Sequence, residues 1–231
     1  MIMYFEGELR SYGTVNVEPF KKPLLNVHED LWISDPRYKV NKNFKDSRTL
    51  WIYTMPLTPD GIFHIFDKSS LFSQEFNDTY LELNKQVEDL TNGIVIRSGI
   101  IRLEPGMSVA RHIDGNHLMM QTCHRMLLAV ITNDKMIYKT DSQDYFLDEG
   151  VLYDVNGYIP HSTHNNGDTA RYSFAFDVLP KESLNKVTIK RYNWDEDLFN
   201  KIAATVPNKP INGLINNWQQ HLENAKKELD K

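Results

Sequence analysis

A succession of short β-segments between residues 93 and 179 constrains the fold of this chain more than any other feature. Turn sequences such as Pro105-Gly106, Asn133-Asp134 and Asn156-Gly157 separate nearly all of the segments. The segments read GIVIRSGIIRLEP, SVARHID, RMLLAVIT, KMIYKT, DYFL, GVLYDV, YIPHSTHN and ARYSFAFDVL. Eight short strands in this rhythm predict a β-sandwich or a jelly roll, and they disfavour a fold in which strands alternate with helices.

Further elements are expected on either side of this region. TLWIYTMP (49–56) and GIFHIFD (61–67) are typical of strands, and the turn sequence TPDG divides them, so the first 75 residues are expected to consist of strands and turns. We expect a single domain over residues 1–231. Its parts are a jelly-roll core at 93–179, N-terminal strands and a helix within 1–92 packed on that core, and a C-terminal helical extension at 180–231.

Helical spacing of apolar residues marks two segments. In FNDTYLELNKQVEDLTNG the apolar residues recur every three to four positions; Asn77 or Asp78 is expected to cap this helix, and Asn92-Gly93 to end it. After residue 180 the chain is expected to be helical, with a long apolar stripe from Ile211 to Leu229. This last helix is expected to pack on the barrel, with a dimer interface as the alternative, so the chain would be a monomer or a homodimer.

Composition disfavours several classes of function. The formal net charge is -5 and the basic residues are scattered, which argues against a nucleic-acid binder. No segment approaches the roughly 18 apolar residues of a membrane span, and the opening MIMYFEGELR turns polar too early for a secretory signal. The single cysteine, Cys123, lies in an apolar run that predicts a buried thiol, and its being alone fits a reducing compartment. We therefore expect a cytoplasmic protein with neither nucleic-acid nor membrane partners.

A candidate metal site begins in the segment SVARHID. Residues i and i+2 of a strand point to the same face, so His112 and Asp114 would present an imidazole and a carboxylate side by side. With His161 from a later strand they would make the two-histidine, one-carboxylate set that binds iron(II) in non-haem oxygenases. The alternative is a surface pair of His112 with Asp114, while His161 caps a turn. His164 is a competing ligand, but it would face away from His161 in an extended strand.

Arg171 adds a second constraint. In RYSFAFD the residues Arg171, Ser173 and Ala175 would share one face of a strand, and the aromatic side chains would occupy the other. A strand with a small, polar face opposite an aromatic face is suited to line a cavity. A guanidinium buried there requires an anionic partner, and a dicarboxylate held by a bidentate contact would provide one. Ser173 would donate a further hydrogen bond to the same carboxylate.

These residues carry a resemblance to a known family. RLEPGMSVARHID, HRMLLAVITN and PHSTHNNGDTARYSFAFD resemble the Fe(II)/2-oxoglutarate-dependent oxygenases, specifically the aspartyl/asparaginyl β-hydroxylase and proline hydroxylase branch, over roughly residues 97–179. The resemblance implies a double-stranded β-helix with iron(II) and 2-oxoglutarate as cofactors. It also implies the role of each matching residue: His112, Asp114 and His161 as catalytic metal ligands, Asn165 as the family's asparagine, and Arg171 and Arg125 as contacts of 2-oxoglutarate.

The chain departs from the family in one position of its R-x-H element. Arg125-Met126-Leu127 has a leucine where relatives place a histidine that helps to hold the co-substrate, which weakens the assignment of Arg125. Asp114 is kept, as on the proline hydroxylase side of the branch. The function favoured is hydroxylation of an amino acid, free or as an Asp, Asn or Pro side chain in a protein, with release of succinate and CO2.

Two other functions remain open at this point. A cupin-like metal- or ligand-binding sensor module could keep the barrel and the metal but lose turnover, and the missing histidine at Leu127 mildly favours it. A zinc-dependent hydrolase or isomerase on the same barrel would retain zinc and would not respond to 2-oxoglutarate.

Overall fold

The computed structural model describes residues 7–32, 46–56, 62–114 and 122–205. The strands within these ranges are β1 (Leu9–Thr14), β2 (Arg48–Thr54), β3 (Ile62–Asp67), β4 (Gly93–Leu103), β5 (Ser108–His112), β6 (His124–Ile131), β7 (Met136–Thr140), β8 (Asp144–Tyr145), β9 (Val151–Val155), β10 (His161–Asn165), β11 (Arg171–Pro180) and β12 (Thr188–Asn193). The helices are α1 (Glu18–Leu25), α2 (Glu29–Trp32), α4 (Gln74–Thr91) and α6 (Glu196–Ala203), with two short 3-10 helices, η2 (Ser69–Leu71) and η3 (Lys181–Lys186).

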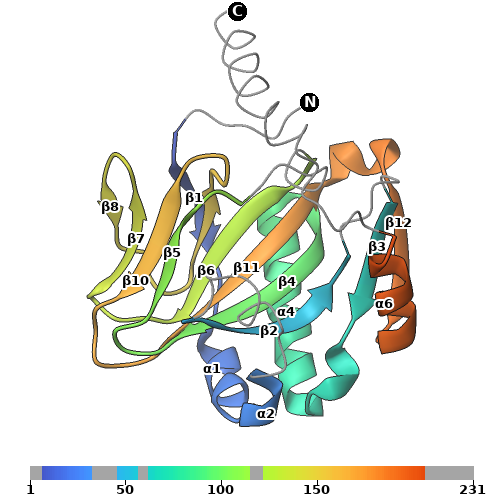
Figure 1. Ribbon diagram of the computed structural model, residues 1–231, viewed down its shortest axis with the longest axis horizontal. Coiled ribbons are helices and arrows are strands. Elements are labelled where there is room, and N and C mark those ends of the chain that lie inside the picture. The colour runs from blue at the N-terminus through green and yellow to red at the C-terminus, as the bar shows by residue number, and fades with distance from the viewer. Residues whose placement is uncertain (1–6, 33–45, 57–61, 115–121, 206–231) are drawn as a thin grey trace, which may run out of the picture.

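The strands form two sheets that lie against each other (Figure 1). The large sheet has the order β1-β9-β6-β11-β4-β2-β3-β12, and the small sheet has the order β5-β10-β7-β8. From β4 to β11 the chain passes back and forth between the two sheets, apart from the hairpin of β7 and β8 within the small sheet. This order is that of a double-stranded β-helix, and all eight strands predicted between residues 93 and 179 are present.

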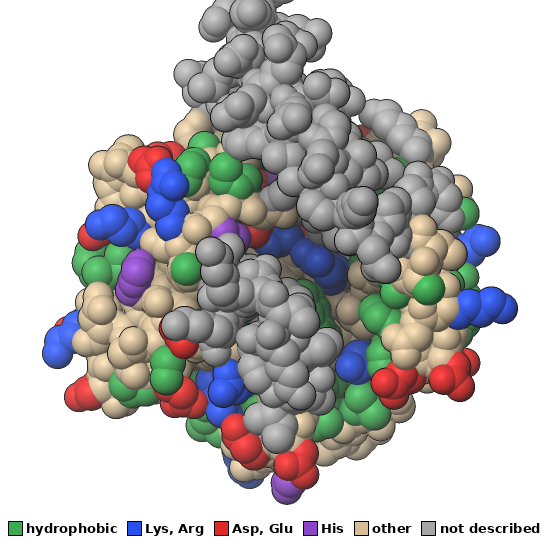
Figure 2. Space-filling view, in the orientation of Figure 1, with side chains coloured by type: hydrophobic (Ala, Val, Ile, Leu, Met, Phe, Trp, Pro, Cys, Tyr) green, Lys and Arg blue, Asp and Glu red, His purple; other side chains and the backbone are tan. Residues whose placement is uncertain are grey.

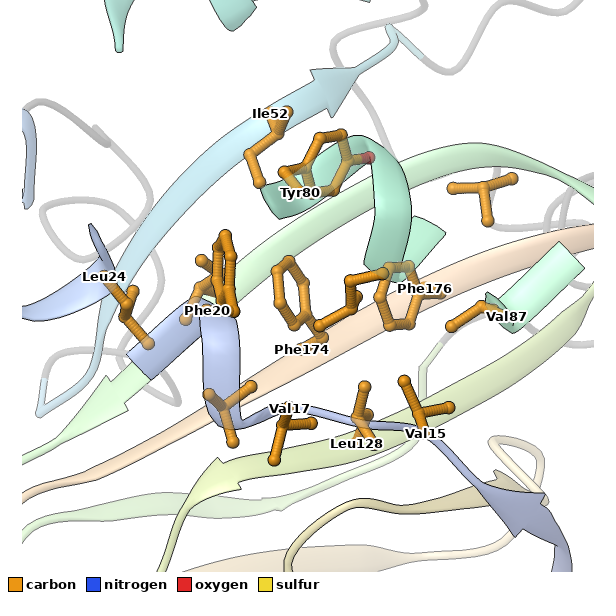
Figure 3. Packing of buried hydrophobic residues seen from close by; sticks show 14 of the residues in the cluster. Val15, Val17, Phe20, Leu24, Ile52, Tyr80, Val87, Leu128, Phe174 and Phe176 are labelled. Atoms are coloured by element: carbon orange, nitrogen blue, oxygen red, sulfur yellow. The ribbon is translucent and has the colours of Figure 1, made fainter. Parts of the chain in front are cut away.

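The strand β11 separates the core of the protein from the interior of the barrel. Its side chains alternate as predicted, because Phe174 and Phe176 are fully buried in the aromatic core between the large sheet and the helices, and Ala175 and Asp177 face the other way. Figure 3 shows Phe174 and Phe176 in this core with Phe20 of α1, whose ring centroid is 5.3 Å from that of Phe174. The outer face is thus sealed by helices, and the inner face is left for a site.

Helix α4 is confirmed, but one of its predicted ends is wrong. Its buried side chains face the large sheet, as helical spacing requires. Asn77 and Asp78 do not cap it: the helix begins earlier, and Ser73 accepts a hydrogen bond from the backbone N–H of Phe76. Asn92 ends the helix as predicted, because it adopts the left-handed conformation with φ of 47°.

Three elements outside the barrel were not predicted. Helices α1 and α2 lie where only strands and turns were expected; α1 holds Pro19 in its first turn and Pro23 inside it, and these prolines conceal its helical pattern. Strand β12 interrupts the tail that was expected to be helical, and it pairs in parallel with β3. Helix α6 is confirmed, whereas the long C-terminal helix and the dimer interface assigned to it fall at 206–231, outside the described residues.

Cys123 is buried as predicted, with 3% of its surface exposed. Across the residues that the structure describes, every helix is too short or too polar to cross a membrane.

Candidate active site

His112, Asp114 and His161 come together at one end of the barrel. Oδ1 of Asp114 lies 3.4 Å from Nε2 of His112 and 3.9 Å from Nε2 of His161. The two imidazole ring centroids are 4.4 Å apart, and the three possible ligand atoms all lie within 4.8 Å of one another. Among the described residues these three therefore form a group that could hold a metal ion.

Hydrogen bonds to the backbone orient both imidazoles toward this centre. Nδ1 of His112 lies 2.8 Å from the carbonyl oxygen of Ala110, and Nδ1 of His161 lies 2.9 Å from that of Ile159. A carbonyl oxygen only accepts, so Nδ1 carries the proton in each ring. In the neutral ring Nε2 is then the atom that carries the lone pair, as a metal ligand requires. Burial lowers the pKa of His161 and so favours this neutral form.

Strand pairing is what brings the two separated stretches together. β5 and β10 are antiparallel neighbours, and His112 and His161 are direct Cα partners in that pairing. The Pro105-Gly106 turn before β5 is closed by a hydrogen bond from the N–H of Met107 to the carbonyl of Glu104, and Gly106 takes the positive φ of 75° that this turn needs. The backbone N–H of Asp114 donates to the carbonyl of Gly157 at 3.0 Å, which fixes the end of the HxD segment.

The triad faces a cavity of about 340 Å³ between the sheets. The face drawn in Figure 2 is hollowed near its centre, and basic side chains lie in the hollow. The walls come from both sheets, and the lining residues are Thr49, Trp51, Arg97, Gly99, Ile101, Val109, His112, Asp114, Arg125, Leu127, Tyr138, Val155, His161, Thr163, Ala175 and Asp177.

A chain of ion pairs crosses the cavity wall beside the triad. Nη1 of Arg125 donates to Oδ2 of Asp114 at 3.0 Å, and Nε of Arg125 donates to Oδ1 of Asp177 at 2.6 Å. The other oxygen of Asp177 accepts from Nε of Arg97, and Cζ of Arg97 lies 5.3 Å from the centroid of the Trp51 ring. Burial by itself would raise the pKa of Asp114, but the charge of Arg125 outweighs it and keeps the pKa well below its usual value.

Arg171 lies deeper in the barrel than the triad. Only 3% of its surface is exposed, and its Nε and Nη2 atoms have no hydrogen-bond partner within the described part of the chain. Burial lowers the pKa of Arg171 to about 10, which still leaves the guanidinium charged at neutral pH. Ser173, two residues on, is also buried on the inner side of β11. A buried cation of this kind is costly unless an anion meets it.

Asn165 secures the turn that leads to Arg171. Its side-chain nitrogen donates to the backbone carbonyls of Leu103 and Thr169, both at 2.9 Å, and its side-chain oxygen accepts from the N–H of Gly167. These bonds join the end of β10 to β4 and to the start of β11. Asn165 thus fixes where Arg171 enters the barrel.

The predicted residues are placed as follows. His112, Asp114 and His161 come together as predicted, and Arg125 lines the same cavity. Arg171 and Ser173 do not line the open cavity, although they lie on the same face of β11 as Ala175 and Asp177, which do. His164 lies apart from the triad, with its Nε2 atom 3.0 Å from the Ser162 hydroxyl.

Several cavity residues were not predicted, among them Trp51, Arg97, Tyr138 and Asp177. The alternation Arg171, Ser173, Ala175 continues to Asp177, so this residue was within reach of the strand pattern. The other three lie on strands whose pairing partners could not be read from the chain.

Comparison with known proteins gives one family and several distant structures. Residues 39–180 match the model of the aspartyl/asparaginyl beta-hydroxylase family, which is more than half of the chain. No curated protein matches the chain.

Solved structures with some similarity include two prolyl hydroxylases. The viral collagen prolyl hydroxylase of Paramecium Bursaria Chlorella virus-1 has 10% identity and a TM-score of 0.46, with 75% of this chain and 95% of that chain covered. The prolyl hydroxylase of Trichoplax adhaerens has 10% identity and a TM-score of 0.47, with 78% and 86% covered. An oxidoreductase of the 2OG-Fe(II) oxygenase family from Burkholderia pseudomallei has 9% identity and a TM-score of 0.42, with 59% and 69% covered. The fold assignment therefore depends on the strand order of this chain itself.

Proposed function

Because this chain belongs to the aspartyl/asparaginyl β-hydroxylase family, and is thus an oxygenase of the Fe(II)- and 2-oxoglutarate-dependent type, we propose that it hydroxylates an amino acid, free or as an Asp, Asn or Pro side chain in a protein. The observation that carries the proposal is the cluster of two imidazoles and one carboxylate at the cavity, with both Nε2 atoms turned toward Oδ1 of Asp114.

The donor set suits iron(II). Two neutral imidazoles and a carboxylate on one side of an ion leave adjacent coordination positions for other ligands, which is how non-haem iron oxygenases bind their co-substrates. Cys123, the single cysteine, lies in a different buried cluster with Tyr158 and Leu179, so no thiolate-rich zinc site can form. In our proposal His112, Asp114 and His161 hold the metal.

The buried guanidinium suits a dicarboxylate. Arg171 has two nitrogen atoms without partners among the described residues, and a carboxylate would satisfy both with a bidentate contact. Ser173 would add a hydroxyl to the same carboxylate. Arg125 is proposed as the contact at the other end of the co-substrate, because it lines the cavity beside Asp114.

Each residue then contributes by binding, orienting or excluding water. When bound, iron(II) and 2-oxoglutarate would supply the oxidation with dioxygen: one atom of O2 would enter succinate as CO2 is released, and the other would be inserted into a substrate C–H bond. Asp114 is kept ionised and oriented by Arg125, and the apolar wall of Val109, Leu127 and Val155 limits water near the reacting groups. A cavity of about 340 Å³ suits a small amino acid or a single side chain rather than a bulky substrate.

Succinate formation tests the proposal directly. Purified protein is incubated with iron(II), 2-oxoglutarate and oxygen, and succinate is measured together with a mass-spectrometric screen for gain of one oxygen in amino acids and in peptides containing Asp, Asn or Pro. We expect succinate from the natural chain, none from His112→Ala, and an unchanged yield from the control His28→Ala, since His28 is exposed and lies outside the site.

The outcomes separate the three functions considered from the sequence. Binding of 2-oxoglutarate without succinate would favour a sensor module. Zinc retention with no response to 2-oxoglutarate would favour a hydrolase or isomerase. Either result would refute the oxygenase proposal.

A further inference from the structure

Tyr138 lies in the wall of the cavity and has no role in the function proposed so far. It comes from β7 of the small sheet, and its ring stacks on that of His161 with centroids 5.5 Å apart and planes 23° apart. It also belongs to the same buried cluster as Leu127 of the large sheet. The ring therefore spans the space between the two sheets next to the metal cluster.

The phenolic hydroxyl of Tyr138 is buried without a hydrogen-bond partner among the residues that the structure describes. Only 2% of the residue is exposed, and it lines the cavity. A buried donor that makes no bond is rare in folded proteins, and one on a residue that lines a cavity indicates a ligand there.

Strand register places Tyr138 between the triad and Arg171. Along β7, Thr140 is the partner of His161, Tyr138 that of Thr163, and Met136 that of Asn165. Tyr138 is thus one step, or two residues, further into the barrel than the metal cluster.

The large sheet shows the same order in four steps. Arg125 is the partner of Asp177, Leu127 that of Ala175, Ala129 that of Ser173, and Arg171 pairs with Leu103 at the far end. Leu103 clusters with Met136, and Leu127 clusters with Tyr138, which matches the levels of the two sheets. A dicarboxylate that reaches from the metal cluster to Arg171 must pass the level of Tyr138.

We propose that Tyr138 binds the co-substrate by donating its hydroxyl proton to an oxygen of 2-oxoglutarate. This inference rests on the proposed function and adds a specific contact to it. Leu127, at the same level of the large sheet, offers no polar atom, so the donor on this part of the path comes from the small sheet. Thr163 and Tyr138 both line the cavity there, and it is the Tyr138 hydroxyl that is buried without a partner among the described residues. Tyr138 is neither a metal ligand nor a proton carrier in this role.

A single pair of variants tests the contact. Tyr138→Phe removes only the hydroxyl, which makes no bond among the described residues, so the packing against His161 and Leu127 is kept. Tyr158→Phe is the matched control, because the Tyr158 hydroxyl is also buried without a partner there but the residue lies outside the cavity lining. The affinity of the Mn(II)-loaded protein for 2-oxoglutarate is measured without oxygen by calorimetry, and thermal unfolding of both variants checks that they fold.

We expect Tyr138→Phe to weaken 2-oxoglutarate binding by about 10-fold or more, as for a lost hydrogen bond to a charged group, and Tyr158→Phe to change it less than about twofold. In turnover, the KM for 2-oxoglutarate should rise with little change in kcat.

Other results would overturn the inference in distinguishable ways. Equal affinity in the natural chain and Tyr138→Phe would refute the contact alone. Unchanged 2-oxoglutarate affinity with weaker binding of the hydroxylated substrate would move Tyr138 to the substrate. A natural chain that binds no 2-oxoglutarate when loaded with Mn(II) would refute the proposed function as well.

Discussion

Nη1 of Arg125 lies 3.0 Å from Oδ2 of Asp114, while Oδ1 of the same carboxylate faces both imidazoles of the triad. One oxygen of Asp114 is therefore held by a cation on β6 of the other sheet, and the other oxygen is left toward the metal centre. A carboxylate held in this way has its orientation fixed by the fold. Asp177 holds Arg125 in turn, so the arrangement depends on a residue that does not touch the triad.

Asp177→Asn should weaken metal binding. The amide cannot balance the charges of Arg125 and Arg97, so Arg125 loses the partner that positions it against Asp114. We expect the affinity for Mn(II) to fall by about 10-fold, as for other outer partners of metal ligands. Asp89→Asn, which breaks the exposed pair with Lys85 on α4, is the control and should leave the affinity unchanged. Equal affinities for the two variants would show that Asp177 has no positioning role.

Arg171→Met should stabilise the protein without co-substrate and abolish its response to 2-oxoglutarate. The substitution keeps an apolar stem but removes a buried cation whose Nε and Nη2 atoms find no partner among the described residues. We expect the free energy of unfolding to rise by about 1–3 kcal/mol, and binding of 2-oxoglutarate to weaken more than about 100-fold.

Urea unfolding and calorimetry measure the two effects, with the exposed Lys85→Met as control. A lower stability of Arg171→Met would mean that the guanidinium has a partner within the protein. Undiminished binding would mean that the co-substrate does not reach it.

Gly99→Ala should destabilise the cavity wall. An added Cβ would lie 2.8 Å from Cε3 and 2.9 Å from Cζ3 of Trp51, closer than side-chain carbons approach in proteins. We expect a loss of about 1–3 kcal/mol in the free energy of unfolding, as for other overpacked sites. Trp51→Phe removes the ring that carries these atoms, so the double variant should recover part of the loss. Strictly additive effects in a double-mutant cycle would refute the proposed clash.

The Cys123 thiol should react slowly in the native protein. Burial raises the pKa of Cys123 to about 12, compared with about 8.5 for an exposed cysteine. Near pH 8 almost no thiolate is present in the folded state, so labelling with a disulfide reagent should be much slower than in denaturant.

The same shift gives the direction of a pH effect on stability. Between about pH 8.5 and 12 the unfolded chain releases the thiol proton and the folded chain retains it, so this group lowers stability as the pH rises. Rapid, complete labelling of the native protein would contradict the burial on which both expectations depend.

Much of the barrel followed from local patterns. The eight strands between residues 93 and 179 were marked by turn residues that act over a few positions, such as Pro105-Gly106 with its positive φ. The faces of β11 followed from strict alternation, since aromatic and small residues occupy alternate positions. Helix α1 was missed because two prolines concealed a pattern that packing against α4 stabilises, and β12 because its pairing with β3 depends on a distant strand.

The sequence by itself determined the residue types of the site and the faces on which they lie, because strand alternation and turn chemistry are local. It supplied His112, Asp114, His161 and Arg171 as candidates. Only the tertiary structure decided that β5 pairs with β10, so that His112 and His161 become direct partners in that pairing. It also decided that Asp177 and Tyr138 line the same cavity. Register and sheet order depend on contacts between residues far apart in the chain, and short-range preferences contain no information about such contacts.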